Sequence, residues 1–206
     1  MKDSTTKIIR RYDRIARFYD LVEGSMEMMI PEDKRREVFE GLAGNLLEIG
    51  VGTGKNIKLY PANLCVTAID FSSKMLAKAR DKAGILNKNV ELLLMDAQQM
   101  SFNDNTFDYV VATCVFCSVP DPIKGFKEIR RVLKPGGKAI FIEHVRSEQR
   151  LLGLLMDIMN PLTVNLYGAN INRRTEANIL EAGFDSLEVT NLWKDIVKKI
   201  VITNKK

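Results

Sequence analysis

The residues best suited to binding a ligand gather in the stretch LLEIGVGTGKN, residues 46–56. An apolar run there carries Glu48 and then opens into alternate glycines, which are Gly50, Gly52 and Gly54. Glycine-rich loops after strands commonly bind phosphate. This loop departs from the phosphate-binding patterns, because Asn56 stands where a P-loop needs Ser or Thr and Lys55 stands where a dinucleotide fingerprint needs glycine. A carboxylate beside the loop would also repel a pyrophosphate.

A ligand with positive charge and no phosphate fits this loop better. S-adenosylmethionine carries a sulfonium and an ammonium group, and a nearby carboxylate favours both cations. Two later acids agree with this ligand. Asp70 ends the second apolar run about 20 residues after Gly50, a place from which a carboxylate binds ribose hydroxyls. Asp96 ends the third run, where it can accept the adenine amino group. The pattern predicts a site for a cationic nucleoside without phosphate.

Short apolar runs and helical patterns alternate after residue 45, and they determine where these groups lie. The runs are residues 46–50, 65–70, 90–95, 107–113 and 138–145. Their nearly continuous apolar character is typical of parallel strands covered on both faces. Helices are expected over SSKMLAKARDKAG, DPIKGFKEIRRVLKPGG and RRTEANILEAGF, and DSLEVTNLW and IVKKIVITN read as a final strand pair. We therefore predict an α/β fold, a Rossmann-like, doubly wound seven-stranded sheet that is mostly parallel with an antiparallel C-terminal edge pair.

The 206 residues carry no composition break or internal repeat, so we expect a single domain over residues 1–206. Within it, residues 1–45 are expected to form an N-terminal helical lid and residues 46–145 the cofactor-binding core. Residues 146–170 form an insertion expected to cover the substrate, and residues 171–206 supply the C-terminal helix and strand pair. Both the lid and the insertion should lie over the carboxyl ends of the strands, where ligands bind in such sheets.

Four segments resemble the class I S-adenosylmethionine-dependent methyltransferases: LLEIGVGTG, AIDFSSKMLAKAR, MDAQQMSFNDNTFDYVVAT and EIRRVLKPGG. The closest resemblance is to the quinone C-methyltransferase and phospholipid N-methyltransferase branch, whose N-terminal helix motif is similar to YDRIARFYDLV. EHVRS and NINRRTEANILEAGF resemble small-molecule and thiol methyltransferases of that branch. Where those relatives have Gly-Cys-His-Leu-Asn-Arg, this chain reads GANINR, so a substrate role for the Cys-His pair does not carry over to Ala169 and Asn170.

The resemblance implies a role for each matched position. Glu48 and the three glycines would line the methionyl end of the cofactor, and Asp70 would hold its ribose. Around the adenosine, the resemblance places Phe71, Met75, Asp96 and Ala97, although core packing explains Phe71 and Met75 equally well. Cys114 would face the cofactor, and Tyr19 would reach the site from the lid as a cofactor-binding and catalytic residue. No residues are assigned to a metal.

His144, the sole histidine, follows the fifth apolar run and is the candidate general base, with a structural histidine as the alternative. The basic excess of residues 1–19 and the Leu- and Met-rich insertion favour a small-molecule or lipid substrate and peripheral contact with a membrane. We expect a cytoplasmic enzyme, because no secretory signal precedes the charged start. No nucleic-acid partner is expected, since neither an N/D-P-P-Y tetrapeptide nor a basic stripe with interleaved aromatics occurs.

Two alternatives to an enzyme of this kind remain. A non-catalytic S-adenosylmethionine-binding sensor or scaffold would keep the glycine loop but would not need an open substrate mouth. An NAD-dependent oxidoreductase is disfavoured by the missing third glycine. Product formation from the methyl donor separates these interpretations from a methyltransferase.

Overall fold

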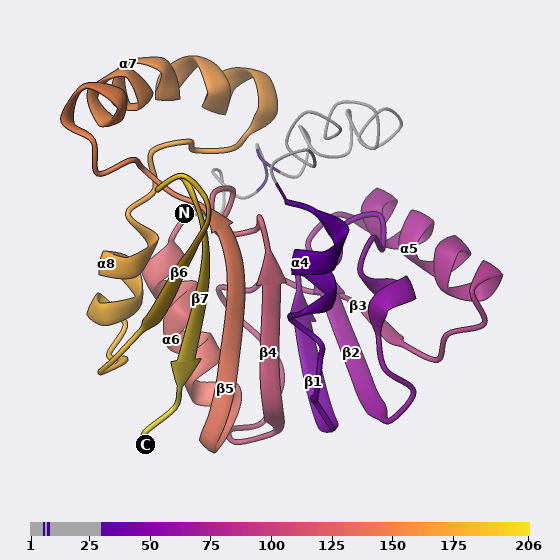
Figure 1. Cartoon of the computed structure of the whole chain (residues 1–206). Helices are drawn as coiled ribbons and strands as arrows, with labels where there is room; N and C mark the ends of the chain where they lie inside the picture. Colours follow the sequence, from indigo (N-terminus) through magenta and orange to yellow (C-terminus); the bar gives the residue numbers. More distant parts are fainter. Residues whose placement is uncertain (1–5, 7, 9–29) are drawn as a thin grey trace.

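The computed structural model describes residues 6, 8 and 30–206, and its centre is a seven-stranded sheet (Figure 1). The strand order is β3-β2-β1-β4-β5-β7-β6. In chain order the strands are β1 Gly44–Ile49, β2 Leu64–Asp70, β3 Glu91–Leu94, β4 Phe107–Thr113, β5 Leu133–His144, β6 Glu188–Trp193 and β7 Val197–Thr203. The pairs among β1 to β5 are parallel, whereas β7 pairs antiparallel with both β5 and β6. The predicted mostly parallel sheet with an antiparallel edge pair is confirmed.

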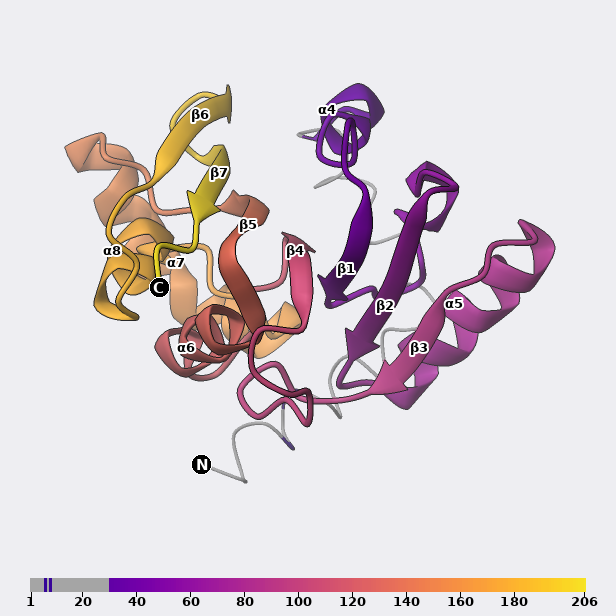
Figure 2. The same cartoon turned by 90° about the horizontal axis from the view of Figure 1, so that it is seen from below.

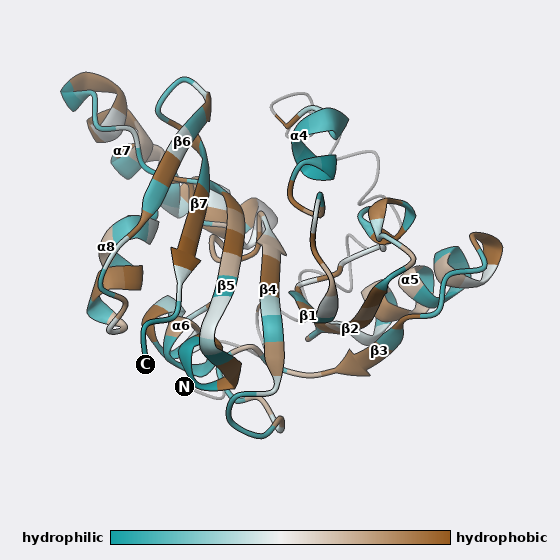
Figure 3. Ribbon diagram, turned by 60° about the horizontal axis from the view of Figure 1, so that its bottom comes forward, coloured by the Kyte–Doolittle hydropathy of each residue, from teal (hydrophilic) through white to brown (hydrophobic). Residues whose placement is uncertain are grey.

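Helices cover both faces of the sheet. They are α4 Glu32–Arg36, α5 Ser73–Ile85, α6 Pro122–Val132, α7 Arg150–Tyr167 and α8 Thr175–Glu181, with a 3₁₀ turn, η1, at Ile57–Leu59. One core cluster joins α6 and α8 to the sheet, and the other joins the segment after α4, η1 and α5 to its opposite face. Viewed from below, α4 and α5 lie on one side and α6 and α8 on the other (Figure 2). The strands between them are largely hydrophobic (Figure 3), as the continuous apolar runs predicted.

The helices α5 and α6 each begin with a side-chain cap. The Ser72 hydroxyl accepts a hydrogen bond from the Met75 N–H at the start of α5, and the Asp121 carboxylate accepts one from the Lys124 N–H at the start of α6. Pro122 stands at the first turn of α6, where its missing N–H would have no partner inside the helix.

The end of α6 differs from the prediction, which carried the helix to the Pro135-Gly136-Gly137 stop. The helix ends at Val132, and the strand β5 already begins at Leu133. Leu133 is fully buried and pairs with Phe107 of β4, so tertiary packing draws this segment into the sheet. The side-chain amide of Asn204 then donates to the carbonyls of Arg130 and Leu133 near the helix end.

The topology places a ligand site at the carboxyl ends of β1 and β4. From β1 the chain passes outward to β2 and β3, while β4 and β5 continue in the other direction, so the strand order reverses between β1 and β4. Ligands in open α/β sheets bind at such a reversal. The helix α7 lies beyond the carboxyl ends of the parallel strands (Figure 1). Among residues 6, 8 and 30–206, no helix is both long enough and apolar enough to cross a bilayer.

Candidate functional site

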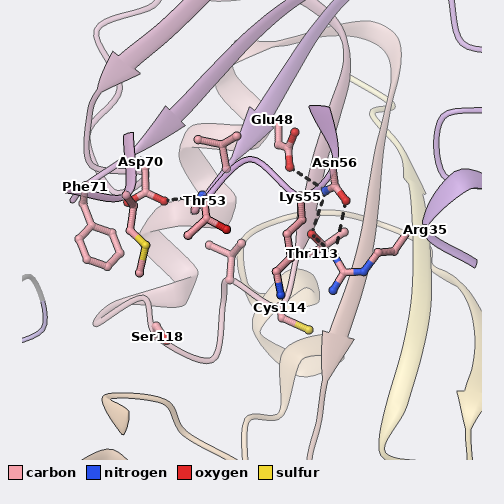
Figure 4. Close-up of a pocket in the computed structure, with 15 residues that line it drawn as sticks. Arg35, Glu48, Thr53, Lys55, Asn56, Asp70, Phe71, Thr113, Cys114 and Ser118 are labelled. Carbon is pink, nitrogen blue, oxygen red and sulfur yellow. Dashed lines mark hydrogen bonds between the residues drawn. The ribbon is translucent and has the colours of Figure 1, made fainter. Parts of the chain in front are cut away.

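Two adjoining cavities open at the reversal point. The second is the smaller of the two. The residues that line both are Gly50, Asp70, Phe71, Val115 and Ser118. The two cavities therefore form one extended site along the carboxyl ends of β1, β2 and β4. Figure 4 shows the first cavity with its lining residues.

The glycine loop is shaped by left-handed backbone angles that disfavour other residues. Gly50 has φ of +67° and Gly52 has φ of +55°. A Cβ on Gly50 would lie 2.5 Å from Val115 Cγ2, whereas a Cβ on Gly52 would meet only a backbone oxygen at 4.0 Å. Gly52 thus leaves open space on the cavity side, which a side chain would fill. Gly54 lines neither cavity and instead packs closely against Ala79 of α5.

Glu48 lies at the base of the first cavity and is almost completely buried, with 1% of its surface exposed. Asn56 Nδ2 donates to its Oε1 at 2.7 Å, and the Tyr60 hydroxyl donates to its Oε2. Burial raises the pKa of Glu48 to about 7, against the lowering effects of the Asn56 hydrogen bond and the Arg35 charge. A carboxylate with this pKa sits between its two protonation states at neutral pH, so a bound cation would shift it towards the charged form.

Asp70 holds the glycine loop and the start of α5 together. Its Oδ2 accepts from the Gly52 N–H at 2.9 Å, and its Oδ1 accepts from the Ser72 N–H at 2.8 Å. Phe71 lines both cavities, and Met75, which is 1% exposed, lines the first. The side chain of Asp70 therefore lies where the two cavities join.

The second cavity gathers the residues predicted to surround adenine. Asp96 and Ala97 line it beside Gln98. The Gln98 amide donates to the Asp96 carboxylate at 2.9 Å, while its Oε1 accepts from the Asp121 N–H at 2.9 Å. Gln98 thereby fixes the Asp96 side chain to the start of α6. Ile8 also lines this cavity.

Sequence reasoning missed six polar residues of the first cavity, which are Arg35, Thr53, Lys55, Asn56, Thr113 and Ser118. Arg35, in α4, is 8% exposed, and its Nη1 donates to Thr113 Oγ1 at 3.3 Å (Figure 4). The sequence carries no local sign of this contact, because Arg35 lies within the stretch predicted as lid and Thr113 ends the distant strand β4. With Lys55, Arg35 gives this cavity two cationic side chains, which suit a carboxylate group of a ligand.

The loop after β4 brings Cys114 into the first cavity with a φ of +56°. The loop is held from behind by Glu143 of β5, which is completely buried and accepts from the Val115 N–H at 3.0 Å and the Phe116 N–H at 3.2 Å. Burial raises the pKa of Glu143 to about 7. Burial also raises the pKa of the Cys117 thiol to about 12, which disfavours its reactive thiolate form.

His144 ends β5 and lines neither cavity. Side chains alternate along a strand, so His144 points to the same face as Ile142, which packs in the cluster that Cys114 borders. Burial lowers the pKa of His144, and its Nδ1 is buried without a hydrogen-bond partner among the described residues. The lowered pKa favours the neutral imidazole, which is the form that a general base requires. Tyr19, the other predicted catalytic residue, lies outside the described residues.

Asn170, which stands where the resembling proteins have histidine, has a contact of its own in this chain. Its side-chain amide and its backbone N–H both donate to the Cys117 carbonyl at 2.9 Å. Its Oδ1 accepts from Asn160 Nδ2 of α7 at 3.1 Å. Asn170 thus connects the helix α7 to the loop that lines both cavities.

The arrangement fits S-adenosylmethionine by the chemistry of its lining groups. A buried carboxylate at the base of the first cavity suits a cation, and Arg35 with Lys55 suits the methionyl carboxylate. The open side of Gly52 allows close approach of a ligand to the backbone. Asp70 lies where the two cavities join, which suits the ribose, and Asp96 lies in the second cavity, which suits adenine. The roles of the individual residues remain predictions.

The comparison with known families agrees with this site. A family model described as a methyltransferase domain matches residues 47–141. A phosphatidylethanolamine N-methyltransferase of Cereibacter sphaeroides is 38% identical over 142 residues, which are 66% of this chain and 68% of that protein. A thiol S-methyltransferase of Rattus norvegicus is 33% identical over 171 residues, which are 77% of this chain and 70% of that protein. A ubiquinone/menaquinone biosynthesis C-methyltransferase of Rickettsia bellii is 31% identical, covering 90% and 88% respectively.

A solved structure extends the likeness to the whole fold. The S-adenosylmethionine-dependent methyltransferase of Thermotoga maritima superimposes with a TM-score of 0.72 over 97% of this chain and 100% of that one. The two sequences are 20% identical, so this likeness concerns the fold.

Proposed function

Because this chain belongs to the S-adenosylmethionine-dependent methyltransferases, we propose that it methylates a small hydrophobic or lipid-like acceptor. The acceptor classes that we propose are a phospholipid amine, a quinone precursor and a thiol. Support comes from the relatives named for a phospholipid, a quinone and a thiol, whose acceptor atoms are nitrogen, carbon and sulfur. A nonpolar or lipid-like acceptor also agrees with the apolar insertion beside the site.

The observation that carries the proposal is the extended site at the carboxyl edge, whose lining loop is joined to α7 through Asn170. This helix exposes Leu154, Leu155 and Ile158. Acidic groups of the chain line the donor side of the site, whereas the exposed face of the neighbouring helix α7 is apolar. An acceptor with a polar reacting atom and an apolar body would satisfy both.

Methyl transfer needs mainly alignment and the exclusion of water, which together can account for a large part of the rate enhancement. S-adenosylmethionine supplies a methyl group already activated by its sulfonium. The chain would orient this donor through the glycine loop, Asp70 and Asp96. Glu143 fixes the loop that carries Cys114 and thereby keeps the walls of both cavities in place. His144 would accept a proton from an acceptor that must lose one.

The test is a transfer assay with isotopically labelled S-adenosylmethionine and three acceptors: phosphatidylethanolamine in mixed micelles, a prenylated quinone precursor and an alkyl thiol. We expect label in at least one of the three. Asp70→Asn is the matched control, because it keeps the side-chain volume but should weaken donor binding. Donor binding without transfer to any of the three acceptors would contradict the lipid-like acceptor and favour the sensor or scaffold.

A further inference from the structure

The helix α7 presents its apolar face to solvent, which is the opposite of an ordinary surface helix. Its polar side chains Asp157 and Asn160 face the protein, where Asp157 accepts from Arg146 Nη2 at 2.8 Å and from Asn172 Nδ2 at 3.0 Å. Asn160 likewise contacts Asn170. In an ordinary surface helix the apolar stripe faces the core and the polar residues face water. The helix α7 is therefore anchored through hydrogen bonds, an ion pair and the buried Met156, while its exposed leucines take no part.

The solvent side of α7 carries a continuous apolar row, made of Leu151, Leu154, Leu155, Ile158, Leu162 and Leu166. These side chains are between 51% and 84% exposed. Their spacing of three and four residues puts them on one face of the helix. Single exposed apolar residues are common on protein surfaces, but a contiguous row of this kind marks an interaction site.

The charges around the row indicate the kind of partner. Among the described side chains of α7, Arg150 is the one exposed charged group, because Asp157 is paired and faces inward. Arg174, also exposed, follows the helix, and the exposed Glu148 that precedes it is paired with Lys198. The sequence adds six Lys and Arg against two Asp within residues 1–19, and the whole chain has a net charge of +5. A second copy of the chain would present the same positive charge, whereas anionic headgroups present the opposite sign.

We propose that the apolar row of α7 docks onto a lipid bilayer that contains anionic lipids. The helix would lie in the plane of the headgroups with its apolar row in the acyl boundary, as interfacial helices do. Its inward side would keep the hydrogen bonds that attach it to the protein. No side chain of the fold would have to leave the core for this contact.

The docked helix would lie next to the site. Asn160 contacts Asn170, and Asn170 donates to the carbonyl of Cys117, which belongs to the loop that lines both cavities. Docking would therefore turn the carboxyl edge of the sheet towards the bilayer. This inference deepens the proposed lipid-like acceptor and rests on it for its biological purpose, but it concerns binding and can be tested without turnover.

The test is flotation of the full chain with vesicles of pure phosphatidylcholine and of phosphatidylcholine mixed with phosphatidylglycerol. Leu151→Ser/Ile158→Ser removes two members of the row, which are 84% and 68% exposed. Ile85→Ser/Leu94→Ser is the matched control, since these residues are 84% and 60% exposed but lie outside α7. We expect binding to mixed vesicles that weakens roughly tenfold or more in the row variant and stays unchanged in the control. Unchanged thermal unfolding of both variants verifies that each is folded.

Three results would overturn the inference. One is a wild-type chain that binds neither kind of vesicle, and another is a row variant that binds as well as the wild type. The third is a dimer, seen by light scattering, that the row variant alone disrupts while vesicle binding is absent; the row would then join two copies of the chain. A chain that binds vesicles through α7 but methylates no lipid-like acceptor would contradict the proposed function and leave this inference standing.

Discussion

Burial of Glu48 predicts that binding of S-adenosylmethionine depends on pH near neutrality. The pKa of Glu48 is raised to about 7, with burial as the largest cause, followed by the opposing Asn56 hydrogen bond and Arg35 charge; Asp70 adds to the increase. Its carboxylate lines the first cavity. A cationic donor in that cavity would stabilise the carboxylate and lower its pKa again. Donor binding should therefore release a proton below pH 7 and become tighter as the pH rises.

The magnitude follows from the fraction of Glu48 that is ionised before the donor binds. With a pKa of about 7, this fraction rises from roughly one tenth at pH 6 to roughly nine tenths at pH 8. The dissociation constant should accordingly fall about tenfold over this range, equivalent to about 1.4 kcal/mol, and should level off at higher pH. S-adenosylhomocysteine lacks the sulfonium charge, so its pH dependence should be weaker.

Isothermal titration calorimetry measures both quantities. Titrations in two buffers with different ionisation enthalpies should give close to one released proton at about pH 6 and close to none at about pH 8. Glu48→Gln should bind the donor more weakly, without proton release and without the pH slope. Glu143→Gln is the control, because Glu143 has a raised pKa in the same range and the glutamine still offers an oxygen that accepts from the loop. In this variant the pH dependence of donor binding should remain. Affinity that does not change with pH, or an equal slope in Glu48→Gln, would refute the reasoning.

Three further predictions concern single residues. Gly50→Ala should lose roughly 2 kcal/mol of stability and most donor binding, because φ is +67° and its Cβ would lie 2.5 Å from Val115 Cγ2. Gly136→Ala is the control, since Gly136 has a φ of +74° but its Cβ would meet no atom within 4 Å. This control should lose only about 1 kcal/mol in urea unfolding and keep donor binding. Burial raises the pKa of Glu143 from 4.5 to about 7, so its stabilising effect is complete below pH 4.5 and is lost as the pH rises through 7. At about pH 8, the free energy of unfolding of Glu143→Gln, measured in urea, should therefore exceed that of the wild type by on the order of 3 kcal/mol. A wild type that is more stable than the variant at that pH would contradict this. His144→Gln should lower kcat roughly 100-fold with unchanged donor affinity, and an unchanged kcat would remove its role as a base.

The sequence alone determined the local features that establish the fold and the donor side of the site. Continuous apolar runs identify strands buried on both faces, and caps such as Ser72 and Asp121 mark helix starts. These signals are short in sequence, because strand period and helix capping depend on a few neighbouring residues. Acids at the ends of parallel strands must meet at one edge of the sheet, so Glu48, Asp70 and Asp96 could be assigned to one site before the structure was known.

Other features were decided only by tertiary packing. The contact of Arg35 with Thr113 joins residues 78 positions apart, and the raised pKa of Glu48 arises from desolvation by the segments packed around it. The reversed orientation of α7 follows from the partners of its polar residues, since a stripe of leucines at helical spacing looks the same whether it faces the core or water. A pattern shows which residues share a face, but distant parts of the chain decide what that face meets.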